Sequence, residues 1–348
     1  MFDFLQLIRS GVEKKASDIH LASGNRPACR INGEIRFFGE QILETGDVDQ
    51  CIRRCLGSEQ YEQFQKTGDA DAAVELAGCG RFRLNAFLQN RGPALVLRVI
   101  GARTPELREL NLPESINRIF ALKSGLVLVT GPTGSGKSTT LAAVINEFNQ
   151  TRHCHIITIE DPIEYLHTPK KCVISQREVG SDSASYARAL KAALREDPDI
   201  ILVGEMRDLE SISIAVTAAE TGHLVFSTLH TIGAANTIDR LVDVFPPEQQ
   251  QQIRTQLSMA LKSVISQRLL PALEGKGRVA AFEIMFVNNA VGNLIREGRT
   301  ANLFQIIETG SAAGMISMEK SIRGLLQSGI IDRSVAEEYS FSTAQCIR

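Results

Sequence analysis

The sequence predicts an α/β protein in which a small α+β domain precedes a phosphate-loop domain. Three observations lead to this prediction. Residues 131–138 read GPTGSGKS, residues 114–231 alternate between helix and strand patterns, and residues 1–100 mix both patterns without a phosphate loop. Alternating strands and helices are typical of a parallel sheet covered by helices. Such sheets bind their ligands at the carboxyl ends of the strands.

Residues 131–138 fit the phosphate-loop pattern of glycine, four residues, glycine, lysine and a hydroxyl residue. A glycine-rich turn before an ordinary helix is the alternative, but an apolar run at 126–129 and helical spacing from Thr140 favour the phosphate loop. Glycines let backbone N–H groups face one concavity, and the helix start favours an anion. Lys137 can reach the outer phosphates, and Ser138 can supply a hydroxyl to magnesium. The predicted nucleotide contacts in this loop are Gly131, Pro132, Thr133, Gly134, Ser135, Gly136, Lys137, Ser138 and Thr139.

Composition limits the class of protein. The 348 residues suffice for two or three domains, and 43 % hydrophobic with 22 % charged residues is ordinary for a globular protein. The net charge of −2 gives no overall electrostatic footprint for nucleic acid. No apolar run approaches the roughly 20 residues that span a bilayer, and no secretion signal is expected. Seven scattered cysteines indicate reduced thiols in a cytoplasmic protein.

The first domain is predicted over residues 1–100 from short periodic segments. Apolar spacing and turn residues indicate helices at 2–12 and 48–56, and strands at 17–21, 30–36, 81–88 and 94–99. Asn32-Gly33 divides the run at 30–36 into a hairpin. Residues 101–113 contain a glycine, two prolines and several charges, so we expect a linker there.

The second domain is predicted over residues 114–348. Its strands are expected at 126–130, 156–160, 200–203 and 224–227, and its helices at 137–150, 183–195 and 209–221. After Thr231 the chain is expected to be mostly helical, with one strand-like run at 279–286. Parallel strands would bring the residues that follow them to one edge of the sheet.

Acidic and basic residues follow three of these strands. Glu205 comes after the run at 200–203, where nucleotide hydrolases place a carboxylate that orients water or magnesium. Glu160 ends another strand and Glu164 lies just after it, and both offer carboxylates for hydrated magnesium or proton removal. His230 follows a third strand, where a polar group can sense the γ-phosphate. The alternatives are a solvated acid, an acidic turn and a structural histidine, and the phosphate loop favours the functional interpretation.

Four blocks of the sequence resemble the secretion ATPases of type II and type IV pilus systems. GPTGSGKST at 131–139, ITIEDPIEY at 157–165, LREDPDIILVGEMRD at 194–208 and STLHT at 227–231 match the family's Walker A, Asp box, Walker B and His box in that order. The resemblance extends over nearly the whole chain, beginning with ASDIHL at 16–21. Within the family, the chain is most similar to the PilT-type twitching-motility retraction ATPases.

The resemblance implies a PAS-like N-terminal domain, a RecA-like ATPase domain and a hexameric ring that hydrolyses ATP with Mg²⁺. Residues 80–100 resemble the block that carries arginine fingers, which implies Arg83 and Arg98; from residues alone, both would be ordinary surface arginines. Arg207 is a weaker phosphate-contact candidate, and Ser138 and Glu205 would hold magnesium, partly through water. Expected partners are an inner-membrane pilus platform protein and a paralogous pilus ATPase, with the chain peripheral at the pilus base.

Two details favour retraction over pilus assembly or type II secretion. Residues 263–290 contain no cysteine, whereas assembly-type relatives often carry a four-cysteine zinc element there. AVGNLIRE at 290–297 resembles the retraction motif AIRNLIRE but departs from it at Val291 and Gly292. The departure at Gly292 removes a positive side chain and keeps an accessory paralogue as an alternative.

Three further function classes are compatible with a phosphate loop. A nucleic-acid ring motor would share the RecA-like core but needs aromatic stacking residues, and the chain has no tryptophan and only four tyrosines. No nucleic-acid partner is therefore expected. A small-molecule kinase would need a substrate pocket and lid in place of the first 100 residues. A non-catalytic ring would bind nucleotide without turning it over.

Overall fold

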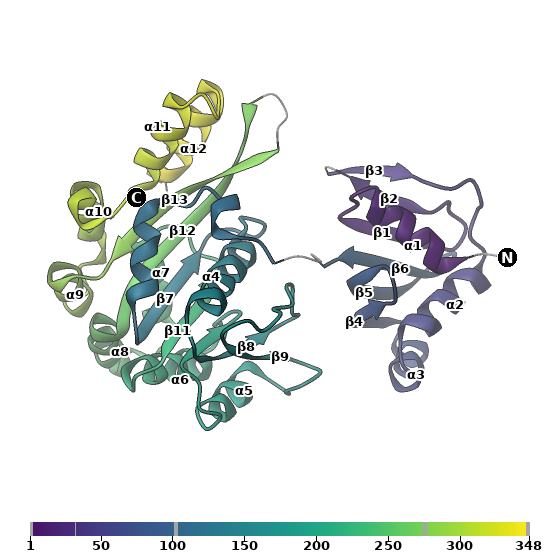
Figure 1. Cartoon of the computed structure of the whole chain (residues 1–348), viewed down its shortest axis with the longest axis horizontal. Coiled ribbons are helices and arrows are strands. Elements are labelled where there is room, and N and C mark those ends of the chain that lie inside the picture. Colours follow the sequence, from purple (N-terminus) through teal and green to yellow (C-terminus); the bar gives the residue numbers. More distant parts are fainter. Residues whose placement is uncertain (1–2, 32, 101–103, 274–276, 346–348) are drawn as a thin grey trace. The chain divides into compact units, whose positions relative to one another are not determined.

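The computed structural model describes residues 3–31, 33–100, 104–273 and 277–345, and it confirms the predicted α/β class (Figure 1). The contacts divide the chain into two compact units, Met1–Arg103 and Thr104–Arg348. The elements of the first unit are α1 Phe4–Glu13, β1 Asp18–Ala22, β2 Ala28–Ile31, β3 Glu34–Phe37, α2 Thr45–Cys55, α3 Ser58–Thr67, β4 Asp69–Leu76, β5 Gly80–Gln89 and β6 Gly92–Val99.

The first unit is a six-stranded antiparallel sheet with helices on one face. The strand order is β3-β2-β1-β6-β5-β4. Phe82 and Leu84 of β5 are buried and pack with residues of α1, α2 and α3. The two share one face of the sheet because every second side chain of a strand points to the same face. The alternation places Arg83 of β5 and Arg98 of β6 on the face opposite the helices, and both are exposed.

The sequence patterns do not reveal two elements of this unit, α3 and β4. The segment of α3 reads SEQYEQFQKT and buries only Tyr61 and Phe64 on its apolar side, so its helical period is weak. The segment of β4 begins DADAA, where small and acidic residues hide the strand pattern. The predicted hairpin is present, since Ile31 pairs with Glu34, and Asn32 lies outside the described residues.

The expected linker at 101–113 falls partly outside the described residues, which omit 101–103. Residues from Thr104 onward are grouped with the second unit. Leu107 and Leu112 pack against its core, and the side-chain amide of Asn146 donates to the carbonyl oxygen of Pro105 at 3.4 Å. Residues 104–113 are therefore held against the second unit.

The second unit is a seven-stranded sheet with the order β13-β12-β7-β11-β10-β8-β9. All neighbouring strands are parallel except β12 and β13. Its strands are β7 Gly125–Thr130, β8 His155–Glu160, β9 Val173–Glu178, β10 Ile200–Val203, β11 Leu224–Leu229, β12 Leu261–Pro271 and β13 Arg278–Phe286. Its α-helices are α4 Lys137–Thr151, α5 Tyr186–Ala193, α6 Leu209–Glu220, α7 Ala234–Asp243, α8 Pro247–Ala260, α9 Asn289–Arg296, α10 Leu303–Thr309, α11 Met318–Gln327 and α12 Arg333–Gln345.

Helices cover both faces of this sheet (Figure 1). Phe148 of α4 packs with Phe226 of β11 on one face, together with the 3-10 helix Glu114–Ala121. Helices α5 to α8 pack on the other face, where Leu128 of β7 and Val203 of β10 are fully buried. All six residues of β7 and all four of β10 are buried, as expected for parallel strands covered on both faces.

Two strands of the second unit, β9 and β12, lie outside the predicted ones. The sequence of β12, LKSVISQRLLP, carries polar residues between apolar ones and lies in a region that is expected to be helical. The strand nevertheless pairs with both β7 and β13, so the chain after Thr231 is a helix pair, a hairpin and then helices. No helix within the described ranges is long and apolar enough to cross a membrane.

His167 in the loop before β9 predicts a specific pH dependence of stability. Burial lowers its pKa from 6.5 to about 4, and its Nδ1 has no hydrogen-bond partner among the described residues. Between these two values the unfolded chain binds a proton that the folded chain excludes, so stability falls as the pH falls. We expect the free energy of unfolding to drop by about 2 kcal/mol more between pH 7 and pH 5 in the intact chain than in His167→Gln. Urea unfolding at both pH values measures this change in the free energy of unfolding. His153→Gln is the control, because His153 is exposed. The same change in the intact chain and in His167→Gln would contradict the prediction.

Candidate functional site

The phosphate loop runs from the end of β7 to the start of α4, as the sequence predicts. Gly131, Gly134 and Gly136 have φ angles of 145°, 75° and 89°, a region that favours glycine. Helix α4 begins at Lys137, so its first N–H groups and its dipole are available to an anion. The local sequence therefore builds an anion-binding turn at the carboxyl edge of the sheet.

Lys137 is folded back onto the loop that it follows. Its Nζ donates to the carbonyl oxygens of Gly131 at 2.9 Å and Pro132 at 3.0 Å, and the residue is only 7 % exposed. Burial lowers the pKa of Lys137, while the charges of Glu164 and Glu205 act in the opposite direction. Two of the three predicted carboxylates, Glu164 and Glu205, therefore lie close enough to influence this ammonium.

Gln267 of β12 lies beneath the loop, and no sequence motif points to it. Its side-chain oxygen accepts a hydrogen bond from Thr140 Oγ1 at 2.7 Å, which joins β12 to the first turn of α4. A Cβ at Gly131 would lie 2.2 Å from the carbonyl oxygen of Gln267, and a Cβ at Gly136 would lie 2.9 Å from its Nε2. The backbone of Gln267 thus leaves no room for a side chain at Gly131, whereas at Gly136 the contact is with the end of a flexible side chain. Gln267 lies between Ser266 and Arg268 in a mixed polar and apolar strand, so its sequence context does not distinguish it.

Replacement of Gly131 by alanine is expected to disrupt the loop. The added Cβ would meet backbone at 2.2 Å, and the φ of 145° is unfavourable for any side chain. We expect the free energy of unfolding to fall by about 2–4 kcal/mol, from steric overlap and backbone strain combined. Gly324→Ala in α11 is the control, because nothing lies within 4 Å of its added Cβ. Thermal unfolding measures both, and an unchanged midpoint for Gly131→Ala would contradict this packing.

Glu205, Arg207 and His230 converge beside Thr133 of the loop. Arg207 Nε lies 2.8 Å from one Glu205 oxygen, and His230 Nε2 lies 3.6 Å from the other. His230 Nδ1 is 3.3 Å from Thr133 Oγ1, so this imidazole connects the end of β11 to the phosphate loop. These four residues border a cavity of about 480 Å³. The sheet brings together residues that are far apart in the sequence.

The histidine of this group is held in its neutral form. Burial lowers the pKa of His230, and the positive charge of Lys137 lowers it further, while Glu205 raises it. At neutral pH the ring therefore has one N–H donor and one acceptor nitrogen. A neutral imidazole can donate a hydrogen bond near a phosphate without adding a fixed charge.

Glu160 and Glu164 occupy different environments. Glu160 accepts hydrogen bonds from Thr158 Oγ1 at 2.6 Å and Gln176 Nε2 at 3.3 Å, and burial raises its pKa. Glu164 is exposed, and its charge acts on Lys137. Of the two, Glu164 is the freer carboxylate. Gln176 lies in the unpredicted strand β9, which explains why the sequence does not reveal it.

The remaining predicted loop residues differ in exposure. Pro132, Thr133, Gly134 and Ser138 are at least partly exposed, whereas Ser135 is buried and its hydroxyl has no partner among the described residues. Thr139 Oγ1 lies 3.0 Å from the hydroxyl of Tyr165, a tether between α4 and the acidic block. The hydroxyl of Ser138 and the carboxylate of Glu205 are hard oxygen donors, which fit Mg²⁺.

Arg83 and Arg98 belong to the first unit and lie beside each other in its sheet. They are directly paired across β5 and β6. Arg98 Nε donates to Asp18 Oδ1 at 2.9 Å, whereas the side chain of Arg83 has no hydrogen bond or ion pair within the described residues. The two predicted fingers are therefore held differently.

The sequence and fold match known proteins along most of the chain. A type IV pilus retraction ATPase, PilT, from Pseudomonas aeruginosa is 48 % identical over 336 residues, covering 97 % of each chain. A twitching motility protein from Neisseria gonorrhoeae is 46 % identical over 95 % of this chain and 88 % of its own length. A crystal structure of the pilus retraction motor PilT with bound ADP superposes with a TM-score of 0.90 at 45 % identity, covering 97 % of each chain.

The family model described as type II/IV secretion system protein matches residues 3–306. This match covers nearly all of the first unit, the second unit up to residue 306 and every predicted site residue. The secretion-ATPase resemblance that the four sequence blocks suggest is thereby confirmed. The chain belongs to the type II/IV secretion system protein family.

Proposed function

We propose that this chain is an ATP-hydrolysing motor that powers the retraction of type IV pili. The observation that carries the proposal is the convergence of Glu205, His230 and Thr133 beside the phosphate loop, with Lys137 under the influence of Glu205. This arrangement offers an anion-binding turn next to a carboxylate that can act on water. The retraction and twitching names belong to relatives with 46–48 % identity over nearly the whole chain.

The proposed reaction is the hydrolysis of ATP to ADP and phosphate. The ammonium of Lys137, which donates to two loop carbonyl oxygens, would instead donate to oxygens of the outer phosphates. Hydrogen bonds between an ammonium and a phosphate are charge-assisted. Glu205 would polarise the attacking water, and neutral His230 would donate to the γ-phosphate. A magnesium ion, held by Ser138 and partly through water by Glu205, would neutralise phosphate charge.

Further residues would assist this reaction. Glu160 and Glu164 would support hydrated magnesium or proton removal, with Glu164 the more accessible carboxylate. Arg207 would contact phosphate from its exposed position. Arg83 and Arg98 of the first unit would neutralise the charge that develops on the γ-phosphate, as arginine fingers do. The loop residues 131–139 would surround the phosphates.

The motor is proposed to be a homo-hexamer that works with membrane partners. The expected organisation is a PAS-like domain, a linker and a RecA-like domain in each chain. Partners would be an inner-membrane pilus platform protein and a paralogous pilus ATPase, with the ring peripheral at the inner membrane. Light scattering on the purified chain with ATP tests the assembly: a mass of six chains is expected.

An accessory role is the second candidate, and one feature favours it. Gly292 lies in α9, buried next to the carbonyl oxygen of Ser258, where a Cβ would approach to 3.2 Å. It borders a polar cavity of about 420 Å³, so the departure from the retraction motif leaves space rather than a positive side chain. Sequence identity points the other way. A type IV pilus ATPase named PilU, from Pseudomonas aeruginosa, is 37 % identical to this chain, whereas PilT from the same organism is 48 % identical.

The proposal is tested in cells from which the gene has been deleted. Loss of a retraction motor should leave an excess of surface pili and abolish surface motility, and the intact chain should restore both. Bald cells would show that the chain drives assembly. Unchanged pili would indicate an accessory role or a different secretion machine. Stimulation of ATP turnover by single-stranded DNA would instead support a nucleic-acid motor.

A further inference from the structure

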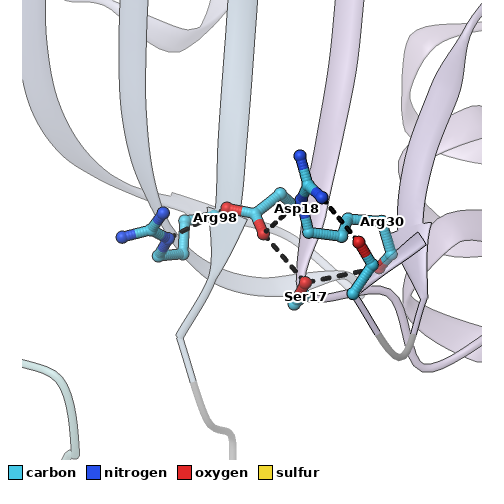
Figure 2. A network of polar contacts seen from close by, with 5 residues as sticks. Ser17, Asp18, Arg30 and Arg98 are labelled. Carbon is cyan, nitrogen blue, oxygen red and sulfur yellow. Dashed lines mark hydrogen bonds and ion pairs between the residues drawn. The ribbon is translucent and has the colours of Figure 1, made fainter. Parts of the chain in front are cut away.

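A buried carboxylate lies between two arginines on the helix-free face of the first sheet. Asp18 of β1 pairs in register with Arg30 of β2 on one side and Arg98 of β6 on the other. Arg98 Nε donates to Asp18 Oδ1 at 2.9 Å, and Ser17 Oγ donates to Oδ2 at 2.8 Å. Figure 2 shows Arg98 and Arg30 on opposite sides of Asp18.

The two partners differ sharply in exposure. The side chain of Asp18 is 10 % exposed and that of Arg98 is 69 % exposed. Burial alone would raise the pKa of Asp18, but hydrogen bonds from Arg98 and Ser17 and the charge of Arg98 lower it overall. Asp18 is therefore an ionised, fixed anchor, while the far end of Arg98 reaches outward.

The guanidinium geometry determines what remains free. Arginine carries five N–H donors in a rigid planar fork, and the contact with Asp18 is made at Nε. The two outer nitrogens point away from Asp18 (Figure 2). Those outer nitrogens suit bidentate contact with phosphate oxygens. Arg30 is occupied differently, since its Nη1 donates to the carbonyl oxygen of Gly33 at 2.7 Å and its Nε is 4.0 Å from Asp18.

We propose that Asp18 is a positioning residue that fixes the Nε edge of Arg98 and so presents its outer nitrogens to the γ-phosphate. This inference rests on the proposed function, in which Arg98 acts as an arginine finger. A finger whose direction is set in advance loses less rotamer freedom when it meets the phosphate. Asp18 itself touches no substrate and acts only through Arg98.

The neighbouring finger provides an internal comparison. Arg83 pairs directly with Arg98 across the sheet, and like charges in that relation repel each other. Within the described residues the Arg83 side chain has no hydrogen-bond or ion-pair partner, so none of those residues holds its guanidinium in one direction as Asp18 holds that of Arg98. Substitution of Asp18 is therefore expected to lower kcat as substitution of Arg98 does. The effect of the Asp18 substitution on kcat should be the same whether or not Arg83 is present.

The test is a double-mutant cycle on the full-length ATPase. The kcat and KM for ATP are measured for the intact chain, Asp18→Ala, Arg98→Ala and the double variant. We expect Asp18→Ala to lower kcat by about tenfold or more with a smaller change in KM, and the double variant to be no slower than Arg98→Ala. In an Arg83→Ala background, the same Asp18 substitution should still lower kcat.

Controls separate positioning from stability. Asp71→Ala removes a carboxylate from the same sheet, where Asn85 Nδ2 donates to it at 3.3 Å, and it should leave kcat intact. If Asp18→Ala does not fold, Asp18→Asn replaces it, and its effect should vanish in the Arg98→Ala background. The inference would be overturned if the fold-decreases in kcat caused by the Asp18 and Arg98 substitutions multiplied in the double variant, because the two residues would then act independently.

The outcomes also distinguish this inference from the proposed function. Suppose that the intact chain hydrolyses ATP, Glu205→Gln is inactive and Asp18→Ala has the kcat of the intact chain. That result would overturn the role of Asp18 and leave the proposed function standing. A normal kcat for Arg98→Ala would overturn it as well. No ATP turnover by the intact chain would overturn both proposals.

Discussion

Glu205→Gln is expected to abolish most ATP turnover while ATP binding is kept. Glutamine has the shape of glutamate and keeps a side-chain oxygen beside Arg207 in place of the ion pair, but it cannot polarise water as a carboxylate does. Loss of such a group typically lowers kcat by about 10²–10⁴-fold. The measurements are steady-state phosphate release and the equilibrium binding of a fluorescent ATP analogue.

Glu210→Gln is the matched control for that substitution. Glu210 lies in α6, close to Glu205 in sequence, and forms an ion pair with Lys191 on an exposed surface. Its loss should leave turnover unchanged. Normal turnover by Glu205→Gln would assign the water to another carboxylate, with Glu164 the first candidate because it is exposed. Weak ATP binding by Glu205→Gln would mean that the substitution disturbs the loop.

Lys137→Ala is expected to weaken nucleotide binding itself. The ammonium would be lost from its place among the loop carbonyls, and with it a charge-assisted contact to the phosphates. Hydrogen bonds to charged groups contribute about 1.5–3 kcal/mol, which corresponds to a rise in Kd of roughly 10- to 150-fold. Isothermal titration with ATP and Mg²⁺ measures this change.

The control for Lys137→Ala is a lysine just before β7. Lys123→Ala removes a charge of the same kind from the same unit, and its Kd should match that of the intact chain. Thermal unfolding of both variants shows whether the phosphate loop remains folded. Unchanged ATP affinity in a folded Lys137→Ala would contradict the proposed phosphate contact.

The sequence reveals those parts of the site that depend on local pattern. Apolar runs locate β7, β8, β10 and β11, and in a parallel sheet the residues that follow such runs meet at one edge. For that reason the sequence alone is enough to expect Glu205 and His230 near the phosphate loop. The glycine spacing likewise accounts for the positive φ angles at Gly131, Gly134 and Gly136.

The parts that escape prediction depend on long-range packing. Gln267 approaches the loop because β12 pairs with β7, and its sequence shows no regular alternation to announce a strand. Gln176 reaches Glu160 from β9, whose residues are mostly half-buried and weakly patterned. The contact between Asp18 and Arg98 joins residues 80 positions apart through the β1–β6 pairing.

The central proposal is that ATP hydrolysis at Glu205 drives pilus retraction. It is tested most directly by time-lapse imaging of labelled pili on cells whose only copy of the gene carries Glu205→Gln, beside cells with Glu210→Gln. The proposal predicts pili that extend but do not shorten, in excess number, while the Glu210→Gln cells retract normally. Pili that shorten at the normal rate in the Glu205→Gln cells would contradict it.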